Sequence, residues 1–149
     1  MLIRYFLLVS SVCLLAACAE SPQHTIDPET GFVVRNFDQN QIDRGKVLYD
    51  ANCIACHGPD GVGTPDWRKT GPDGKYPPPP LNGTAHTWHH STAVLKKTIL
   101  KGGPPEFGSM PAWEGKLTEQ QVDDIIVWIK SLWPDEIYNV WFTNFEGKD

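Results

Sequence analysis

The chain has 149 residues and a formal net charge of −5 at pH 7. That length suits one domain with a modest core. No run of lysine and arginine is visible, so we expect no binding to nucleic acid. An acidic chain of this kind is better matched to a protein partner that offers a basic or mostly apolar surface.

Residues 1–17 are predicted to be a signal peptide. Residues 1–4 carry one positive charge, and the apolar run over residues 5–17 is too short to span a bilayer comfortably. The segment ends in Leu15-Ala16-Ala17-Cys18, which resembles a bacterial lipobox, where cleavage precedes a cysteine that becomes acylated. The alternative is an ordinary leader with a cysteine nearby by chance. We favour a lipoprotein, in which acyl chains on Cys18 attach the protein to a membrane.

Cleavage before Cys18 has consequences for charge and location. Loss of Arg4 changes the formal charge from −5 to −6. The leader, together with the cysteine motif at residues 53–57, predicts that the domain lies in the periplasm or on an equivalent oxidising face. Ala19, rather than an aspartate, follows the lipid site, and this pattern resembles outer-membrane lipoproteins of proteobacteria, so we expect the outer membrane over the inner one. Residues 18–37 show no sustained periodicity and are expected to form a lipid-attached tether.

A first helix is predicted to begin near residues 38–40. Asp38 and Gln41 have the spacing of a capping box. Gly45 and Tyr49 share one face of this helix. Its apolar positions are Ile42, Val47 and Leu48. A glycine inside a helix costs about 1 kcal/mol relative to alanine, so Gly45 indicates either the close approach of another group or a tolerated glycine.

The helix leads into Cys53-Ile54-Ala55-Cys56-His57, which has the spacing of a c-type haem attachment site. Two thiols three positions apart can add to the two vinyl groups of one porphyrin, and the adjacent imidazole can bind the iron through Nε2. A redox dithiol expects a βαβ context that is absent, and half of a zinc site would need a second cysteine pair. The motif therefore predicts one covalent haem c, and with Cys18 lipidated no cysteine remains for a disulfide.

A long irregular segment over residues 58–80 follows, rich in glycine and ending in four prolines. Around a haem, such a loop is expected to cover one side of the ring. It closes with Pro80-Leu81-Asn82-Gly83, where a proline carbonyl can accept the Nδ1–H of His57, unless the prolines only stiffen the loop. Pro80 and the apolar Leu81 are thus candidate haem-binding residues.

A second helix is predicted over residues 87–101, ending at a glycine pair. Its start holds a cluster of His86, His89 and His90. The cluster is consistent with a copper or zinc site, or with a polar helix entrance whose rings pack at the haem edge. We favour the second interpretation because no carboxylate or cysteine ligand accompanies the histidines.

Met110 lies in a glycine- and proline-rich segment, and it is the only methionine left once the leader is removed. A core methionine usually fills a gap on a helix or strand. A lone methionine in an irregular loop between helices that flank a haem is better explained as the sixth ligand of the iron. The metal ligands are therefore predicted to be His57 and Met110.

The last strong helix is predicted to begin at Thr118, which forms a capping box with Gln121. Its expected apolar face has Trp128 at the margin, while charged residues lie away from it. The face consists of Val122, Ile125, Ile126, Ile129, Leu132 and Trp133, and the charged residues are Asp123, Asp124 and Lys130. Residues 134–149 form an aromatic C-terminal extension, expected to be a short helix folded back on the body, with an exposed docking surface as the alternative.

Together these residues resemble class I monohaem cytochromes c, over residues 39–133. The resemblance rests on the haem motif after a helix with Gly45 and Tyr49, the turn after Pro80, the Met110-Pro111-Ala112-Trp113 segment and the terminal amphipathic helix. It implies an all-α cytochrome c fold over residues 38–133, with three main helices around one covalently bound haem plus a short C-terminal helix. It also implies that Gly45 and Tyr49 pack on the terminal helix near Trp128, and that Pro79 or Pro80 holds the proximal histidine.

The predicted function is electron transfer, because an iron with both axial positions filled by protein has no vacancy for substrate. The chain would be a lipid-anchored carrier or the redox subunit of a periplasmic oxidoreductase, not an enzyme in itself. Its electron donor and acceptor are redox proteins that the sequence does not identify. The alternatives are a haem sensor or small-gas binder with a labile Met110, and a small haem enzyme such as a peroxidase.

Overall fold

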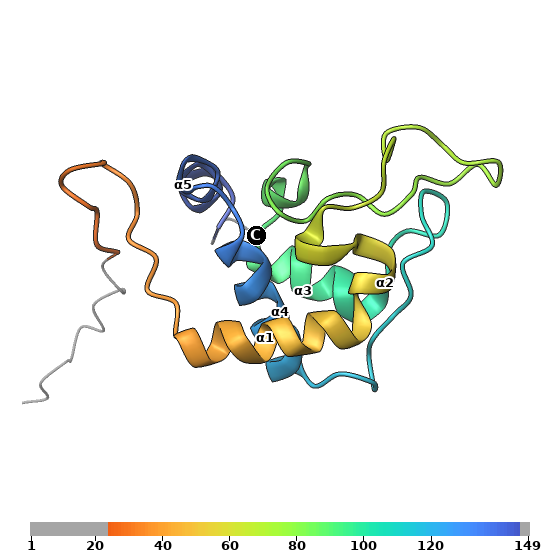
Figure 1. The fold of residues 1–149 in the computed structure, drawn as a ribbon, viewed down its shortest axis with the longest axis horizontal. Coiled ribbons are helices and arrows are strands. Elements are labelled where there is room, and N and C mark those ends of the chain that lie inside the picture. The colour runs from red at the N-terminus through yellow and green to blue at the C-terminus, as the bar shows by residue number, and fades with distance from the viewer. Residues whose placement is uncertain (1–23, 147–149) are drawn as a thin grey trace, which may run out of the picture.

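A computed structural model describes residues 24–146, so the predicted signal peptide and the lipidation site at Cys18 lie outside the described part of the chain. Within it the structure is helical, and its only β pairing consists of two isolated bridges (Figure 1). The helices are α1 (Gln39–Asn52), α2 (Ile54–His57), α3 (Thr92–Lys101), α4 (Glu119–Ser131) and α5 (Asp135–Asn144), with 3-10 turns at Pro59–Gly61 and Thr87–His89. The all-α class is confirmed.

Helices α1 and α4 cross at a close contact, and this crossing organises the fold (Figure 1). A Cβ atom on Gly45 would lie 2.1 Å from the backbone oxygen of Asp124 and 2.8 Å from the Cβ of Trp128. One turn further on, the ring of Tyr49 packs on the ring of Trp128 with their centroids 4.2 Å apart. Gly45 is therefore needed for close approach, and the predicted contact of Gly45 and Tyr49 with the terminal helix is confirmed.

The two predicted capping boxes have different outcomes. At α4, the Thr118 side chain accepts from the Gln121 N–H and the Gln121 side chain accepts from the Thr118 N–H, so this box is confirmed. At α1, the Asp38 side chain accepts from the N–H of Asn40 instead. The box with Gln41 was wrong, although Asp38 is the cap; its carboxylate satisfies a free N–H one residue earlier than the box requires.

The predicted second helix begins five residues later than expected. Residues Thr87–His89 form a separate 3-10 turn, and His90 is extended. The side chain of Ser91 accepts from the Val94 N–H at 3.2 Å, and this cap sets the start of α3 at Thr92. The helix ends as predicted at Gly102, which has a positive φ of 83°.

Two charged residues of α4 that were expected to lie away from the core are buried. Asp124 is 3% exposed and Lys130 is 7% exposed. The Asp124 carboxylate accepts from Arg44 of α1 at 2.9 Å, and the Lys130 ammonium lies 4.5 Å from the centre of the Trp141 ring. Trp128, expected at the margin of the apolar face, is only 3% exposed and lies in the core. Partners on other helices, which periodicity does not reveal, explain these errors.

The C-terminal extension folds back on the body, as expected. Trp141 and Tyr138 of α5 are 1% and 7% exposed, and both belong to the same buried cluster as Trp128 and Trp133. Glu146 accepts hydrogen bonds from the backbone N–H and the hydroxyl of Thr92, which ties the end of the extension to the start of α3. The extension therefore continues the core.

The described part of the predicted tether, residues 24–37, also packs on α5. Val33 is 8% exposed and joins the buried cluster, and its N–H donates to the Asn139 side chain at 3.1 Å. Arg35 pairs with Asp135 at 2.6 Å, and its guanidinium lies 4.5 Å from the centre of the Tyr138 ring. These residues are part of the folded body rather than a free tether. No helix of residues 24–146 is long and apolar enough to cross a membrane.

Candidate haem site

The cysteine motif lies where α1 ends and α2 begins. The N–H of Cys53 donates to the Tyr49 carbonyl at 2.8 Å, and the N–H of His57 donates to the Cys53 carbonyl at 2.9 Å. The Tyr49 hydroxyl donates to the Gly58 carbonyl at 2.8 Å. The motif is therefore held at both ends by Tyr49, the residue that also packs on α4. Cys53 is half-buried and Cys56 is exposed, and neither forms a disulfide.

The His57 imidazole is 9% exposed, and its Nδ1 lies 3.0 Å from the carbonyl oxygen of Pro79. A carbonyl can only accept a hydrogen bond, so Nδ1 carries the proton and the lone pair is on Nε2. This is the tautomer that a proximal haem ligand requires. Of the two prolines proposed for this role, the structure selects Pro79; the carbonyl of Pro80 accepts from the Thr87 hydroxyl at 3.1 Å.

Burial also sets the protonation of the motif. It lowers the pKa of His57, and the hydrogen bond to Pro79 only partly opposes this. It raises the pKa of the Cys53 thiol to about 11, with a smaller contribution from Cys56. At neutral pH the imidazole is therefore uncharged, which is the form that binds a metal.

The loop over residues 58–80 returns to the motif, and residues 79–82 lie against two glycines of this loop, Gly61 and Gly63. Gly63 has a φ of +71°, and a Cβ there would lie 2.3 Å from the nitrogen of Pro80. The N–H of Leu81 donates to the carbonyl of Gly61 at 2.7 Å, and the indole N–H of Trp133 donates to the carbonyl of Leu81, also at 2.7 Å. Pro80 and Leu81 thus follow directly after the residue that contacts His57, and their haem-binding role stays a prediction.

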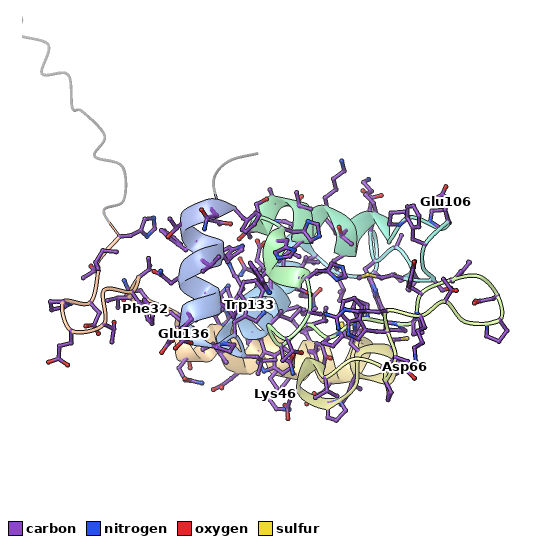
Figure 2. All side chains as sticks on the ribbon, turned by 90° about the horizontal axis from the view of Figure 1, so that it is seen from above. Phe32, Lys46, Asp66, Glu106, Trp133 and Glu136 are labelled. Atoms are coloured by element: carbon purple, nitrogen blue, oxygen red, sulfur yellow. The ribbon has the colours of Figure 1, made fainter. Side chains whose placement is uncertain are left out.

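Two residues that hold this segment, Thr87 and Trp133, were not singled out for the site from the sequence. The sequence predicts a helix at Thr87 and an apolar helix face at Trp133, with no role for either at the haem. In Figure 2, Trp133 lies beside α5, whereas Asp66 and Glu106 lie toward the opposite end of the molecule. No sequence motif marks Thr87 or Trp133, because each donates its hydrogen bond to a backbone carbonyl, which every residue type carries.

Met110 lies in the irregular segment between α3 and α4, as expected, and is half-buried. The N–H of Gly103 donates to its carbonyl at 3.1 Å, and a Cβ on Gly102 would lie 2.9 Å from the same oxygen. The N–H of Tyr76 donates to the carbonyl of Phe107 at 2.8 Å, which joins the long loop to the Met110 segment. Ligation of iron by Met110 stays a prediction.

The histidine cluster is packed among aromatic rings. The centroids of His86 and Trp67 are 5.3 Å apart, and those of His89 and Trp88 are 3.9 Å apart. Burial, with smaller contributions from His90, His89 and Arg68, lowers the pKa of His86. Across residues 24–146, no group of three or more His, Cys, Asp or Glu side chains is arranged to hold a metal ion.

Comparison with known proteins agrees with this geometry. Residues 40–129 match the family described as cytochrome c oxidase, cbb3-type, subunit III. The chain belongs to this cytochrome c family. It is a class I c-type cytochrome, and its function is electron transfer through haem c.

Its relatives include redox proteins of more than one kind. A cbb3-type cytochrome c oxidase subunit CcoP of Azospirillum sp. (strain B510) is 31% identical over 111 residues, which are 72% of this chain and 35% of the relative. A FixP subunit of Bradyrhizobium diazoefficiens is 30% identical over 60% of this chain and 27% of the relative. A thiosulfate dehydrogenase of Allochromatium vinosum is 54% identical over 47% of this chain and 27% of the relative.

The chain therefore spans about a third of the length of the curated relatives it matches. No solved structure matches it.

Proposed function

We propose that this chain is a membrane-tethered electron carrier with one haem c, attached through Cys53 and Cys56, and with His57 and Met110 as axial ligands. The observation that carries the proposal is the hydrogen bond from His57 Nδ1 to the carbonyl of Pro79 at 3.0 Å. It fixes the imidazole with Nε2 free, one residue after the second cysteine of the only attachment motif in the sequence.

The residues fit a haem that exchanges single electrons. When bound, the haem supplies an iron that alternates between the ferric and ferrous states. A methionine ligand at Met110 raises the reduction potential relative to a second histidine. Apolar cover by Leu81 and Trp113 acts in the same direction, because the oxidised site carries more charge and loses more hydration when water is excluded. With both axial positions filled, the site moves electrons and binds no substrate.

The proposed location follows from the leader. Lipidation at Cys18 would hold the domain at the periplasmic face of a membrane, with the outer membrane favoured by Ala19. A lipid anchor of this kind raises the effective concentration of the carrier near its membrane partners. The relatives are named as subunits of cbb3-type oxidases and as a thiosulfate dehydrogenase, which supports a role as a carrier or redox subunit of a periplasmic oxidoreductase.

The decisive experiment measures the haem and its sixth ligand. The protein is produced in a host with c-type cytochrome maturation, and its intact mass is compared with that of Cys53→Ala and Cys56→Ala variants. We expect one haem mass on the wild type. The ferric protein should show the far-red charge-transfer band of a methionine–iron bond.

Met110→Ala should remove this band, lower the potential and open the iron to cyanide and carbon monoxide. The matched control is Phe107→Ala, in the same segment, whose side chain is 63% exposed. This variant should keep the band. An unchanged band in Met110→Ala would refute the ligand assignment, and rapid carbon monoxide binding by the wild type would indicate a haem sensor instead.

A further inference from the structure

The run of prolines beside His57 can be fixed only through its carbonyl groups. Proline has no N–H, so residues 77–80 donate no backbone hydrogen bond. Each of the last three carbonyls has a donor in the structure. The donors are the N–H of Thr64 to Pro78 at 3.0 Å, Nδ1 of His57 to Pro79 at 3.0 Å and the hydroxyl of Thr87 to Pro80 at 3.1 Å.

The next carbonyl, that of Leu81, is held from the opposite end of the chain. The indole N–H of Trp133 donates to it at 2.7 Å. Trp133 is 2% exposed and lies two residues beyond the end of α4, the helix that crosses α1. Helix α1, which leads into the cysteine motif, packs on α4, and the segment around Pro79 is held by Trp133 just beyond the end of α4. Both parts of the site are therefore positioned by the same region of the chain.

Two glycines of the long loop, Gly61 and Gly63, also approach this segment closely. A Cβ on Gly63 would lie 2.3 Å from the Pro80 nitrogen and 2.6 Å from the Pro79 carbonyl carbon. The N–H of Leu81 donates to the carbonyl of Gly61. The backbone around Pro79 is therefore held by the Gly63 turn on one hand and, through the next two carbonyls, by Thr87 at Pro80 and Trp133 at Leu81.

We propose that Thr87 and Trp133 are positioning residues for the proximal ligand: by holding the carbonyls of Pro80 and Leu81, they keep the Pro79 carbonyl on Nδ1 of His57. This inference rests on the proposed function, in which His57 binds the haem iron. A held Nδ1–H makes the imidazole a stronger electron donor to a metal. Loosening the clamp therefore weakens that donation, which favours ferrous iron and raises the reduction potential.

The test uses the haem-loaded full protein and two variants that each delete one donor. Thr87→Val keeps the shape of the side chain, and Trp133→Phe keeps an aromatic ring. The readouts are solvent exchange of the His57 Nδ1 proton, followed by NMR of the reduced protein, and the reduction potential. Exchange should rise by about fivefold or more in each variant, in line with the loss of one hydrogen bond, and the potential should shift upward.

The matched control is Trp141→Phe. Its indole N–H donates to the His90 carbonyl at 2.9 Å, and Trp141 packs on Trp133 with the ring centroids 5.5 Å apart. The variant thus loses the same kind of bond in the same cluster, but not one to residues 79–81. We expect Nδ1 exchange within twofold of wild type. Should Trp133→Phe fail to fold, the isosteric Thr87→Val still decides the matter.

Three results would overturn the inference. Unchanged exchange and potential in Thr87→Val and Trp133→Phe, with His57 still bound to iron, would overturn it and leave the proposed function intact. An equal rise in Trp141→Phe would show a general loosening of the core instead of a positioning role. Absence of His57 ligation in the wild-type protein would overturn the inference together with the proposed function.

Discussion

Replacing Gly45 with alanine tests whether the contact between α1 and α4 holds the haem motif in place. A new Cβ would lie 2.1 Å from the backbone oxygen of Asp124, and it would have to move by about 1.3 Å to reach an ordinary contact of 3.4 Å. The oxygen belongs to the backbone of a buried helix, so no side-chain rotation can relieve the overlap. The two helices must separate, and the ring contact between Tyr49 and Trp128 must loosen with them.

The magnitude follows from three contributions. Alanine gains about 1 kcal/mol of helix propensity over glycine. Overpacking a buried contact costs about 1–3 kcal/mol, and a clash with backbone falls at or above the upper end of that range. Loosening an aromatic pair adds about 1 kcal/mol. We expect a net loss of ~3 kcal/mol, which corresponds to a fall in Tm on the order of 10 °C.

The assay is urea and thermal unfolding of the haem-loaded protein, followed by far-UV circular dichroism and the Soret absorption. The control is Val47→Ala, a change to alanine on the same helix at a side chain that is 70% exposed. It should be neutral or slightly stabilising, since it raises helix propensity and removes little packing. A Gly45→Ala protein as stable as wild type would refute the close-approach argument.

Three further predictions test other parts of the chain. Gly63→Ala should lower Tm more than Gly74→Ala, because both glycines have a positive φ but only Gly63 faces a backbone clash, whereas Gly74 faces open space. Asp124→Asn should lower the urea midpoint near pH 7. The hydrogen bond from Arg44 lowers the pKa of Asp124, so its carboxylate stabilises the native state above the ordinary carboxyl pKa, and this gain is lost as the pH falls through the lowered value. The midpoint difference should therefore vanish in acid, and a constant difference would contradict the argument. Cys18→Ser should move the protein from the membrane to the soluble fraction, and unaltered fractionation would exclude a lipid anchor at that residue.

The sequence predicts the position and the buried face of a helix correctly where the pattern of residues within that helix alone decides which side is buried. Gly45 and Tyr49 marked the contact face of α1, and Thr118 with Gln121 marked the start of α4. Periodicity failed where a polar side chain finds a partner on another element. Asp124 is buried because Arg44 of α1 reaches it, and a pattern within one helix carries no information about that pairing.

The candidate site shows the same division. Cys53, Cys56 and His57 follow from a motif, because covalent attachment needs a fixed spacing. The choice between Pro79 and Pro80 did not follow, since adjacent prolines look alike in sequence and only the path of the loop decides which carbonyl faces His57. The contacts of Thr87 and Trp133 with this segment could not be predicted either, because no sequence motif accompanies them.

A redox site works best when its surroundings do not rearrange as the charge on the metal changes, and preorganised hydrogen bonds serve that purpose. In this chain the segment beside His57 is irregular, so no helix or sheet ladder fixes it. It is fixed instead by giving the carbonyls of Pro79, Pro80 and Leu81 one donor each. Because two of these three residues are prolines that cannot donate, the carbonyls have no competing local partner within the run. An irregular loop can thus be as well defined as a helix, and that property suits residues 79–81 to hold the His57 imidazole in one orientation, as the proposed ligand role requires.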